Sequence, residues 1–111
     1  MGIQQWSKDV ILVNLAPEPQ LSEELDSVSD MIEGSGECSV VVDFSDVDII
    51  TSSSLAAMLN LHKQLSNLDR ELLFCSVSRK TNGLFEVVGL DNVFNFIDDK
   101  FVALAAVQLA V

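Results

Sequence analysis

The apolar positions of this chain come in short blocks, and their spacing alternates between strand-like and helix-like. Two apolar runs, at residues 3–6 and 10–15, flank the turn-forming residues 7–9, which predicts an antiparallel hairpin. Pro17 and Pro19 then end the second strand, because proline has no amide hydrogen to donate to a strand ladder. The chain is therefore expected to open with a two-stranded β-hairpin.

Four later stretches carry apolar residues at helical spacing, with polar positions between them. Gly34-Ser35-Gly36 ends the first helix, Ser78 is expected to cap the third, and Asp98 or Asp99 the fourth. The expected buried sides are Leu21, Leu25, Val28 and Ile32; then Leu55, Met58, Leu59, Leu65 and Leu68; then Leu84, Phe85 and Val88; and last Phe101, Leu104 and Val107.

Three nearly continuous apolar runs, at residues 40–44, 72–77 and 93–97, separate the predicted helices. A continuous run implies a strand buried on both faces, which is typical of a parallel sheet. Strands that alternate with helices predict βαβ units. We therefore expect one α/β domain over residues 1–111, with a mixed, mostly parallel sheet of about four or five strands and about four helices packed on it.

The charge is strongly negative and uneven. The formal net charge is −11, and no lysine or arginine occurs between Lys8 and Lys63. Such a surface repels phosphate backbones and anionic lipids, so we expect no nucleic-acid partner. No apolar stretch approaches the roughly 20 residues that span a bilayer, so direct membrane insertion is not expected. Residues 1–9 lack a basic and apolar leader pattern, which indicates a cytoplasmic protein.

The usual signatures of catalysis and cofactor binding are missing from the sequence. There is no GxSxG, P-loop or GxGxxG motif, and His62 is the one histidine. Cys38 and Cys75 have neither the spacing nor the neighbours of a zinc site, and both are expected to be reduced and at least partly buried. Asp43, Asp46 and Asp48 lack the spacing of a calcium loop. We expect no catalytic residue, metal or cofactor.

The run Thr51-Ser52-Ser53-Ser54 follows a buried strand and opens a helix. One hydroxyl can cap the helix by accepting a hydrogen bond from a free amide of its first turn. A helix start also favours added negative charge, so the run is compatible with a phosphoacceptor site as well. The residues alone leave both interpretations open, a helix cap or a phosphorylation switch.

The ordered segments VVVDFSDV at 40–47, IITSSSL at 49–55, the strand at 72–78 and LFEVVGLDNVF at 84–94 resemble the STAS family of bacterial anti-sigma factor antagonists. Thr51 and Ser54 stand where that family usually has aspartate and glycine, and residues 16–20 depart from its usual first loop. The resemblance implies the STAS fold for nearly the whole chain.

The same resemblance implies a regulatory protein-binding module with Ser52, or alternatively Ser53, as phosphoacceptor. The implied partners are a serine kinase that is itself the anti-sigma factor, and a serine phosphatase. An alternative is a STAS scaffold without phosphorylation, as an accessory subunit of a sensory or lipid-transport complex. The oligomeric state stays open. The expected partner-binding surface comprises Asp46, Asp48, Thr51, Ser54, Ala56, Ala57 and Asn60.

Overall fold

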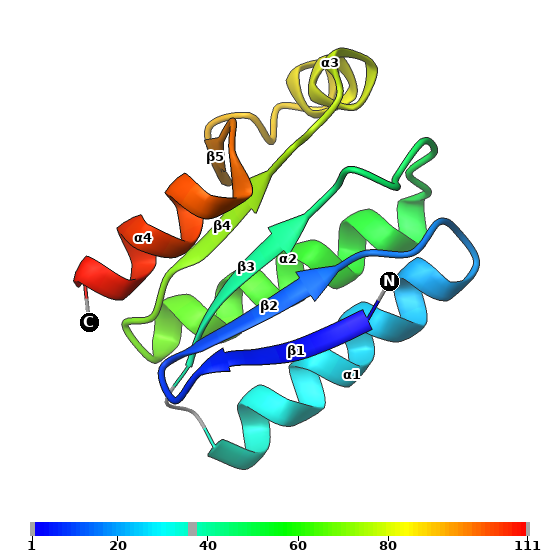
Figure 1. Ribbon diagram of the computed structural model, residues 1–111. Helices are drawn as coiled ribbons and strands as arrows, with labels where there is room; N and C mark the ends of the chain where they lie inside the picture. The colour runs from blue at the N-terminus through cyan, green and yellow to red at the C-terminus, as the bar shows by residue number, and fades with distance from the viewer. Residues whose placement is uncertain (1, 36–37, 111) are drawn as a thin grey trace.

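The computed structural model describes residues 2–35 and 38–110 of the chain. Strands and helices alternate after an initial hairpin, as the sequence predicts (Figure 1). The elements are β1 (Gly2–Ser7), β2 (Val10–Asn14), α1 (Gln20–Ser35), β3 (Ser39–Asp43), α2 (Ser52–Asn67), β4 (Leu72–Cys75), α3 (Arg79–Val87), β5 (Asn95–Ile97) and α4 (Lys100–Ala110).

The strands form one sheet in the order β1-β2-β3-β4-β5. β1 pairs antiparallel with β2, and every other neighbouring pair is parallel. Every residue of β3 is buried, which explains its continuous apolar run. The α/β fold with a mixed, mostly parallel sheet is therefore confirmed.

Helices cover both faces of this sheet. α1 and α2 lie behind it in the view of Figure 1, and α4 lies in front. One core joins β2, β3 and β4 to α1, α2 and the Phe85 side chain of α3, and a smaller core joins the other face to Ala103, Leu104 and Val107 of α4. Two long helices thus cover one face of the sheet, and one short helix covers the other.

The buried side of α2 differs from the prediction. Ser54, Met58, Leu61 and Leu65 face the core, whereas Leu59 and Leu68 are 38% and 41% exposed. Leu68 is the C-terminal cap residue and lies beyond the last helical turn. The prediction was wrong at Leu59 and Leu68 and missed Leu61, because five leucines in this stretch permit more than one helical register.

Three other expectations near the C-terminus were also wrong. Val88 is 45% exposed because α3 ends at Val87, and Phe101 is 65% exposed on the outer side of α4. The last strand begins at Asn95, so Val93 and Phe94 precede it. Phe94 instead packs its ring 4.6 Å from that of Phe74, inside the main core. The expected caps at Ser78 and Asp99 are confirmed, because Ser78 accepts from the Thr81 amide and Asp99 from the Phe101 amide. Gly36 of the expected end of the first helix lies outside the described residues.

The loops that follow β2, β3 and β4 leave the same edge of the sheet, because these strands are parallel. The β2–α1 loop, the β3–α2 turn and the start of α3 therefore meet at one end of the molecule (Figure 1). The hydroxyl run that opens α2 belongs to this end.

Candidate partner-binding site at the start of α2

The turn between β3 and α2 is held at its base by a buried carboxylate. Asp43 is 3% exposed, and its Oδ1 accepts hydrogen bonds from the Ser45 amide at 3.0 Å and the Ser45 hydroxyl at 2.8 Å. Val47 is buried, and its amide donates to the Phe44 carbonyl at 3.0 Å. The turn is therefore anchored before it reaches the surface.

The turn then crosses the surface before the chain re-enters the core. Asp48 is exposed, Ile49 is 61% exposed, and Ile50 and Thr51 are half-buried. Ser54 is the next fully buried residue. Anchors at both ends thus present a short exposed segment, residues 48–53, in a fixed position.

A reciprocal cap fixes the first turn of α2. Thr51 has extended backbone angles, and its Oγ1 accepts from the Ser54 amide at 3.2 Å. The Ser54 Oγ accepts from the Thr51 amide at 2.8 Å, which completes a capping box. Glycine at position 54 could not make the second bond. The two departures from the family pattern therefore form one matched pair that caps the helix.

Ser52 and Ser53 have no part in this cap. Both are exposed, and their hydroxyls make no hydrogen bond within residues 2–35 and 38–110. Their amides are in the first turn, where no helical carbonyl precedes them, and α2 has no acidic residue in that turn. Open hydroxyls beside open amides at a helix start form a setting that tolerates an added anion.

Glu18 joins the start of α1 to the start of α2. Its Oε2 accepts from the Thr51 hydroxyl at 3.3 Å, and its Oε1 accepts from the Ser22 amide and hydroxyl, both at 3.2 Å. The sequence reasoning missed this residue. The signal was available in principle, because β2 and β3 are adjacent parallel strands whose following loops meet.

The predicted partner-binding residues fall into three groups. Asp46, Asp48, Ala56 and Asn60 are exposed and flank Ser52 along the turn and the outer side of α2. Ala57 is half-buried against the main core, and Thr51 is half-buried in the cap. Ser54 has no exposed surface, so it cannot touch a partner in this arrangement, and its expected contact role is withdrawn.

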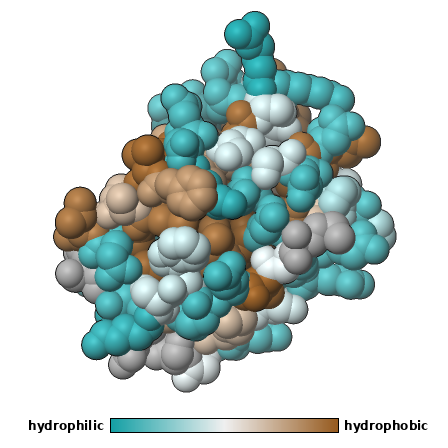
Figure 2. Space-filling view, viewed as in Figure 1, coloured by the Kyte–Doolittle hydropathy of each residue, from teal (hydrophilic) through white to brown (hydrophobic). Residues whose placement is uncertain are grey.

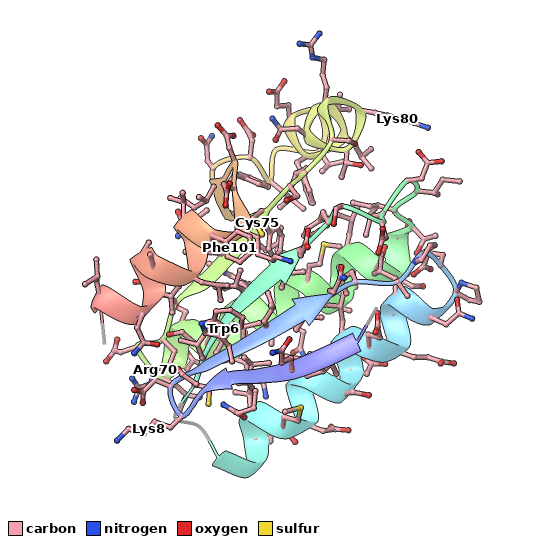
Figure 3. All side chains as sticks on the ribbon, viewed as in Figure 1. Trp6, Lys8, Arg70, Cys75, Lys80 and Phe101 are labelled. Atoms are coloured by element: carbon pink, nitrogen blue, oxygen red, sulfur yellow. The ribbon has the colours of Figure 1, made fainter. Side chains whose placement is uncertain are left out.

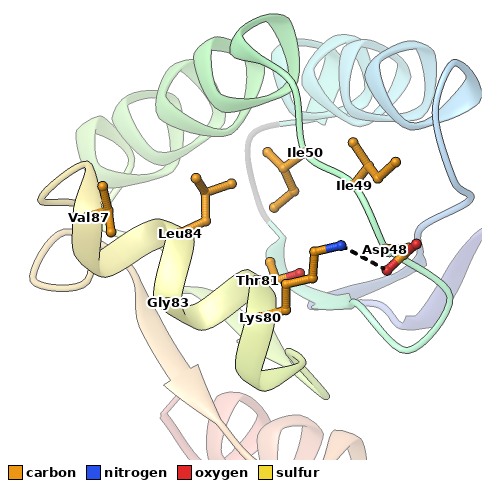
Figure 4. A pocket seen from close by; sticks show the side chains of 8 residues that line it. All are labelled: Asp48, Ile49, Ile50, Lys80, Thr81, Gly83, Leu84 and Val87. Carbon is orange, nitrogen blue, oxygen red and sulfur yellow. Dashed lines mark ion pairs between the residues drawn. The ribbon is translucent and has the colours of Figure 1, made fainter.

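An apolar cavity of about 410 Å³ lies beside the exposed segment (Figure 4). Ile49 and Ile50 of the turn form one side of it, and α3 forms the other. An ion pair of 3.8 Å between Lys80 Nζ and Asp48 Oδ1 lies at its rim, with both side chains mostly exposed. The residues that α3 contributes to this cavity are Lys80, Thr81, Gly83, Leu84 and Val87. Sequence reasoning missed the cavity because α3 comes close only in the folded chain.

Among the residues that the structure describes, no group of three or more histidine, cysteine and acidic side chains could hold a metal ion. No helix in residues 2–35 and 38–110 is long and apolar enough to span a bilayer. His62 is half-buried, with its ring edge-on to Phe94 at 5.7 Å. Cys38 and Cys75 are free and buried, and burial, followed by the nearby Asp43 charge, raises the pKa of the Cys75 thiol to about 11.

Comparisons with known proteins agree on one family. The family model described as "STAS domain" matches residues 9–101. A protein of Bordetella bronchiseptica named "Putative anti-sigma factor antagonist BtrV" is 32% identical over 99 residues, which cover 89% of this chain and 82% of that protein.

Two solved structures share the fold at lower identity. A STAS domain protein from Planctomyces limnophilus superposes with a TM-score of 0.78 at 19% identity, over 96% of both chains. The anti-sigma factor antagonist SpoIIAA in its unphosphorylated form superposes with a TM-score of 0.76 at 13% identity, also over 96% of both chains.

Proposed function

This chain belongs to the STAS domain family, and we propose that it is an anti-sigma factor antagonist whose binding to its partner is switched off by phosphate on Ser52. The partner is an anti-sigma factor that is also the serine kinase, and a serine phosphatase restores the binding form. Catalysis in this cycle belongs to those partners. The chain itself is a binding module and a kinase substrate that works in the cytoplasm.

The proposal rests on the different roles of the four hydroxyls at residues 51–54. Thr51 and Ser54 supply the cap, so Ser52 and Ser53 are not needed for helix stability. Both remain exposed, and they lie on a segment that buried residues anchor at each end. A kinase needs such a hydroxyl, one that is accessible and held in a defined place.

We prefer Ser52 over Ser53 because, in the family that this chain resembles, the acceptor serine directly follows the residue that corresponds to Thr51. A phosphate there would add a charge of about −1.5 to −2 at pH 7. The open amides and the dipole of α2 would stabilise it within this chain. A partner docked over the turn would instead meet a bulky, strongly hydrated dianion, so phosphorylation would remove the partner without unfolding the antagonist.

The cavity beside Ile49 and Ile50 supports the same location for the partner. Ile50, which lines this cavity, is two residues before Ser52 in the sequence. The cavity offers apolar surface to a partner side chain. The exposed acids Asp46 and Asp48 lie on the same turn, where they would favour basic groups on the partner. We propose that the interface consists of this turn, the outer side of α2 near Ala56 and Asn60, and the cavity.

One observation favours a second candidate, a scaffold that is never phosphorylated. Thr51 replaces the family aspartate, so the carboxylate that precedes the acceptor serine in relatives is missing from this position. Glu18 brings a carboxylate to the Thr51 hydroxyl from the neighbouring loop, but both of its oxygens accept hydrogen bonds already. A scaffold would keep its partner whatever charge residue 52 carries.

The deciding experiment compares tagged wild type with Ser52→Ala, Ser52→Asp, Ser53→Asp and Ser66→Asp in the native cytoplasm. Ser66 is exposed near the opposite end of α2, so Ser66→Asp adds the same charge away from the site. Captured proteins are identified by mass spectrometry, and phosphate is mapped on the recovered chain. We expect wild type, Ser52→Ala and Ser66→Asp to capture a serine kinase that Ser52→Asp loses.

Phosphate should appear at Ser52 of the wild type and be absent from Ser52→Ala. If Ser53→Asp alone loses the kinase and phosphate maps to Ser53, the acceptor is Ser53. If all variants retain the same partner and no phosphate is found, the switch is excluded and the scaffold function takes its place.

A further inference from the structure

The outer side of α4 is apolar and uncovered, which is unusual for a helix of this composition. Phe101, Val102 and Leu109 are 65%, 56% and 87% exposed, and Ala105 lies exposed between them. The inner side of α4 is also apolar, with Ala103, Leu104 and Val107 buried against the sheet. A helix that is apolar on all sides is normally buried on all sides.

The exposed apolar side chains lie on one continuous face (Figure 2). Brown and tan atoms gather over α4 at the left of that view, and Figure 3 places Phe101 and Trp6 on the same face of the molecule. Trp6 of β1 is 43% exposed. This apolar surface, made of Phe101, Val102, Ala105 and Leu109 with Trp6 beside it, is termed the α4 surface. Patches of this kind usually mark a contact with another molecule.

We propose that the α4 surface binds a second copy of this chain, with the two α4 helices antiparallel and Ala105 at the twofold axis. Residues 101, 105 and 109 are spaced four apart and share one side of the helix. The stripe is large at each end and small in the middle. In an antiparallel pair Leu109 of one copy enters the space among Phe101, Val102 and Ala105 of the other, a knob in a hole.

The distribution of charge makes the α4 surface the most favourable place for two copies of this chain to meet. Each chain carries a net charge of −11, so two copies repel wherever acidic faces meet. The stripe itself contains no charged residue between Phe101 and Ala110. The charges nearest to it in the sequence are Asp98, Asp99 and Lys100 at the start of α4, and the Asp99 carboxylate already caps the helix. Two copies therefore meet most favourably here.

This dimer would leave the proposed switch free. α4 and α2 pack on opposite faces of the sheet, so a second copy on α4 does not cover Ser52 (Figure 1). The inference is independent of the proposed function. α4 has 11 residues and is about 16 Å long, so the contact is small. We expect a dissociation constant on the order of 10–100 μM for such an interface.

The first test is sedimentation velocity of the wild type, Leu109→Asp and Val87→Asp from about 5 μM to about 1 mM, a range that brackets the expected constant. Leu109 and Val87 are 87% and 85% exposed, so neither variant should unfold, and each adds one negative charge. Leu109→Asp should raise the dissociation constant about a hundredfold or more, because each dimer would bury two carboxylates near Asp98 and Asp99 of the other copy. Val87→Asp, on α3, should dimerise as the wild type does.

The second test locates the axis. Ala105→Cys should form an intermolecular disulfide on mild oxidation, whereas Gln108→Cys, whose parent side chain accepts a hydrogen bond from Ser7, should not. The native Cys38 and Cys75 are buried and do not compete. A wild type that stays monomeric throughout, a dimer that survives Leu109→Asp, or equal cross-linking at 105 and 108 would each overturn the proposal. Monomers that bind lipid vesicles instead would assign the surface to a membrane and would also overturn it.

Discussion

Lys100 at the start of α4 is paired with Asp43 at the end of β3, with Nζ and Oδ2 3.8 Å apart. The Asp43 side chain is 5% exposed and the Lys100 side chain 33% exposed. The same carboxylate holds Ser45 through its other oxygen. One buried group therefore connects α4, on one face of the sheet, with the turn that leads to Ser52.

This pair has a natural control in the same molecule, because Lys80 and Asp48 are also 3.8 Å apart but mostly exposed. Removing the partner of a buried charge is costly, whereas an exposed pair is worth about 0–1 kcal/mol. We expect Lys100→Met to lower the free energy of unfolding by about 1–3 kcal/mol and Lys80→Met by less than about 0.5 kcal/mol. Urea unfolding measures both, and equal losses would show that the Asp43 pair contributes nothing through burial.

The capping box predicts an energetic coupling between Thr51 and Ser54. Thr51→Ala should cost about 1 kcal/mol of stability, because the Ser54 amide loses its acceptor. Ser54→Ala should cost a similar amount, since the Thr51 amide is then unpaired. The double variant should cost less than the sum of the single losses, because both break the same unit. Ser52→Ala should change stability by less than about 0.5 kcal/mol, and strict additivity would contradict the reciprocal cap.

A related prediction concerns the family residues at these two positions. Thr51→Asp keeps a side-chain oxygen at the cap, but it replaces the hydroxyl that donates to Glu18 Oε2 with a second carboxylate, so it should cost about 1 kcal/mol. Ser54→Gly removes the reciprocal bond and adds backbone freedom inside a helix, which together should cost about 1–2 kcal/mol. If Ser54→Gly instead leaves the unfolding midpoint unchanged, the two departures are not a matched pair.

Charge at the two ends of α2 should act on stability with opposite signs. Ser52→Asp places a carboxylate beside the open amides of the first turn and should stabilise the fold by about 0.3–1 kcal/mol. Ser66→Asp places it near the carbonyls of the last turn and should destabilise the fold by a similar amount. Thermal unfolding at low salt measures the difference. If Ser52→Asp loses both stability and partner binding, unfolding and not the added charge would explain the loss of binding.

The positions of β3 and β4 could be predicted from the sequence, because each is a nearly continuous apolar run between turn-forming residues. The side of α4 that packs on the sheet could not be predicted from the sequence. Its sequence is apolar on every side, so no hydrophobic stripe distinguishes the inner Leu104 from the outer Phe101. The four hydroxyls of residues 51–54 predict a cap or a phosphosite. Which of them cap the helix depends on backbone geometry, because only the start of the helix at Ser52 decides that Ser54 turns inward.

Cys75 predicts a specific pH dependence. Burial, reinforced by the Asp43 charge, raises the pKa of the folded thiol from 9.0 to about 11. Folding thus favours the neutral thiol, so this contribution to stability is complete below pH 9 and is lost as the pH rises through 11. The free energy of unfolding should therefore fall in this window for the wild type. The fall should be smaller for Cys75→Val, which has no proton to lose, and identical slopes would remove Cys75 as the cause.

The cavity next to Ser52 predicts a residue on α3 that matters for binding and not for folding. Val87 lines the cavity and is 85% exposed, whereas the neighbouring Val88 is 45% exposed and does not line it. Val87→Asp should leave the unfolding midpoint within about 0.5 kcal/mol of the wild type. It should weaken binding of the purified partner about tenfold or more, because a carboxylate would be desolvated where an apolar side chain docks. Val88→Asp is the matched control and should bind normally. Equal affinity for both variants would place the partner away from α3 and restrict the interface to the turn and the outer side of α2.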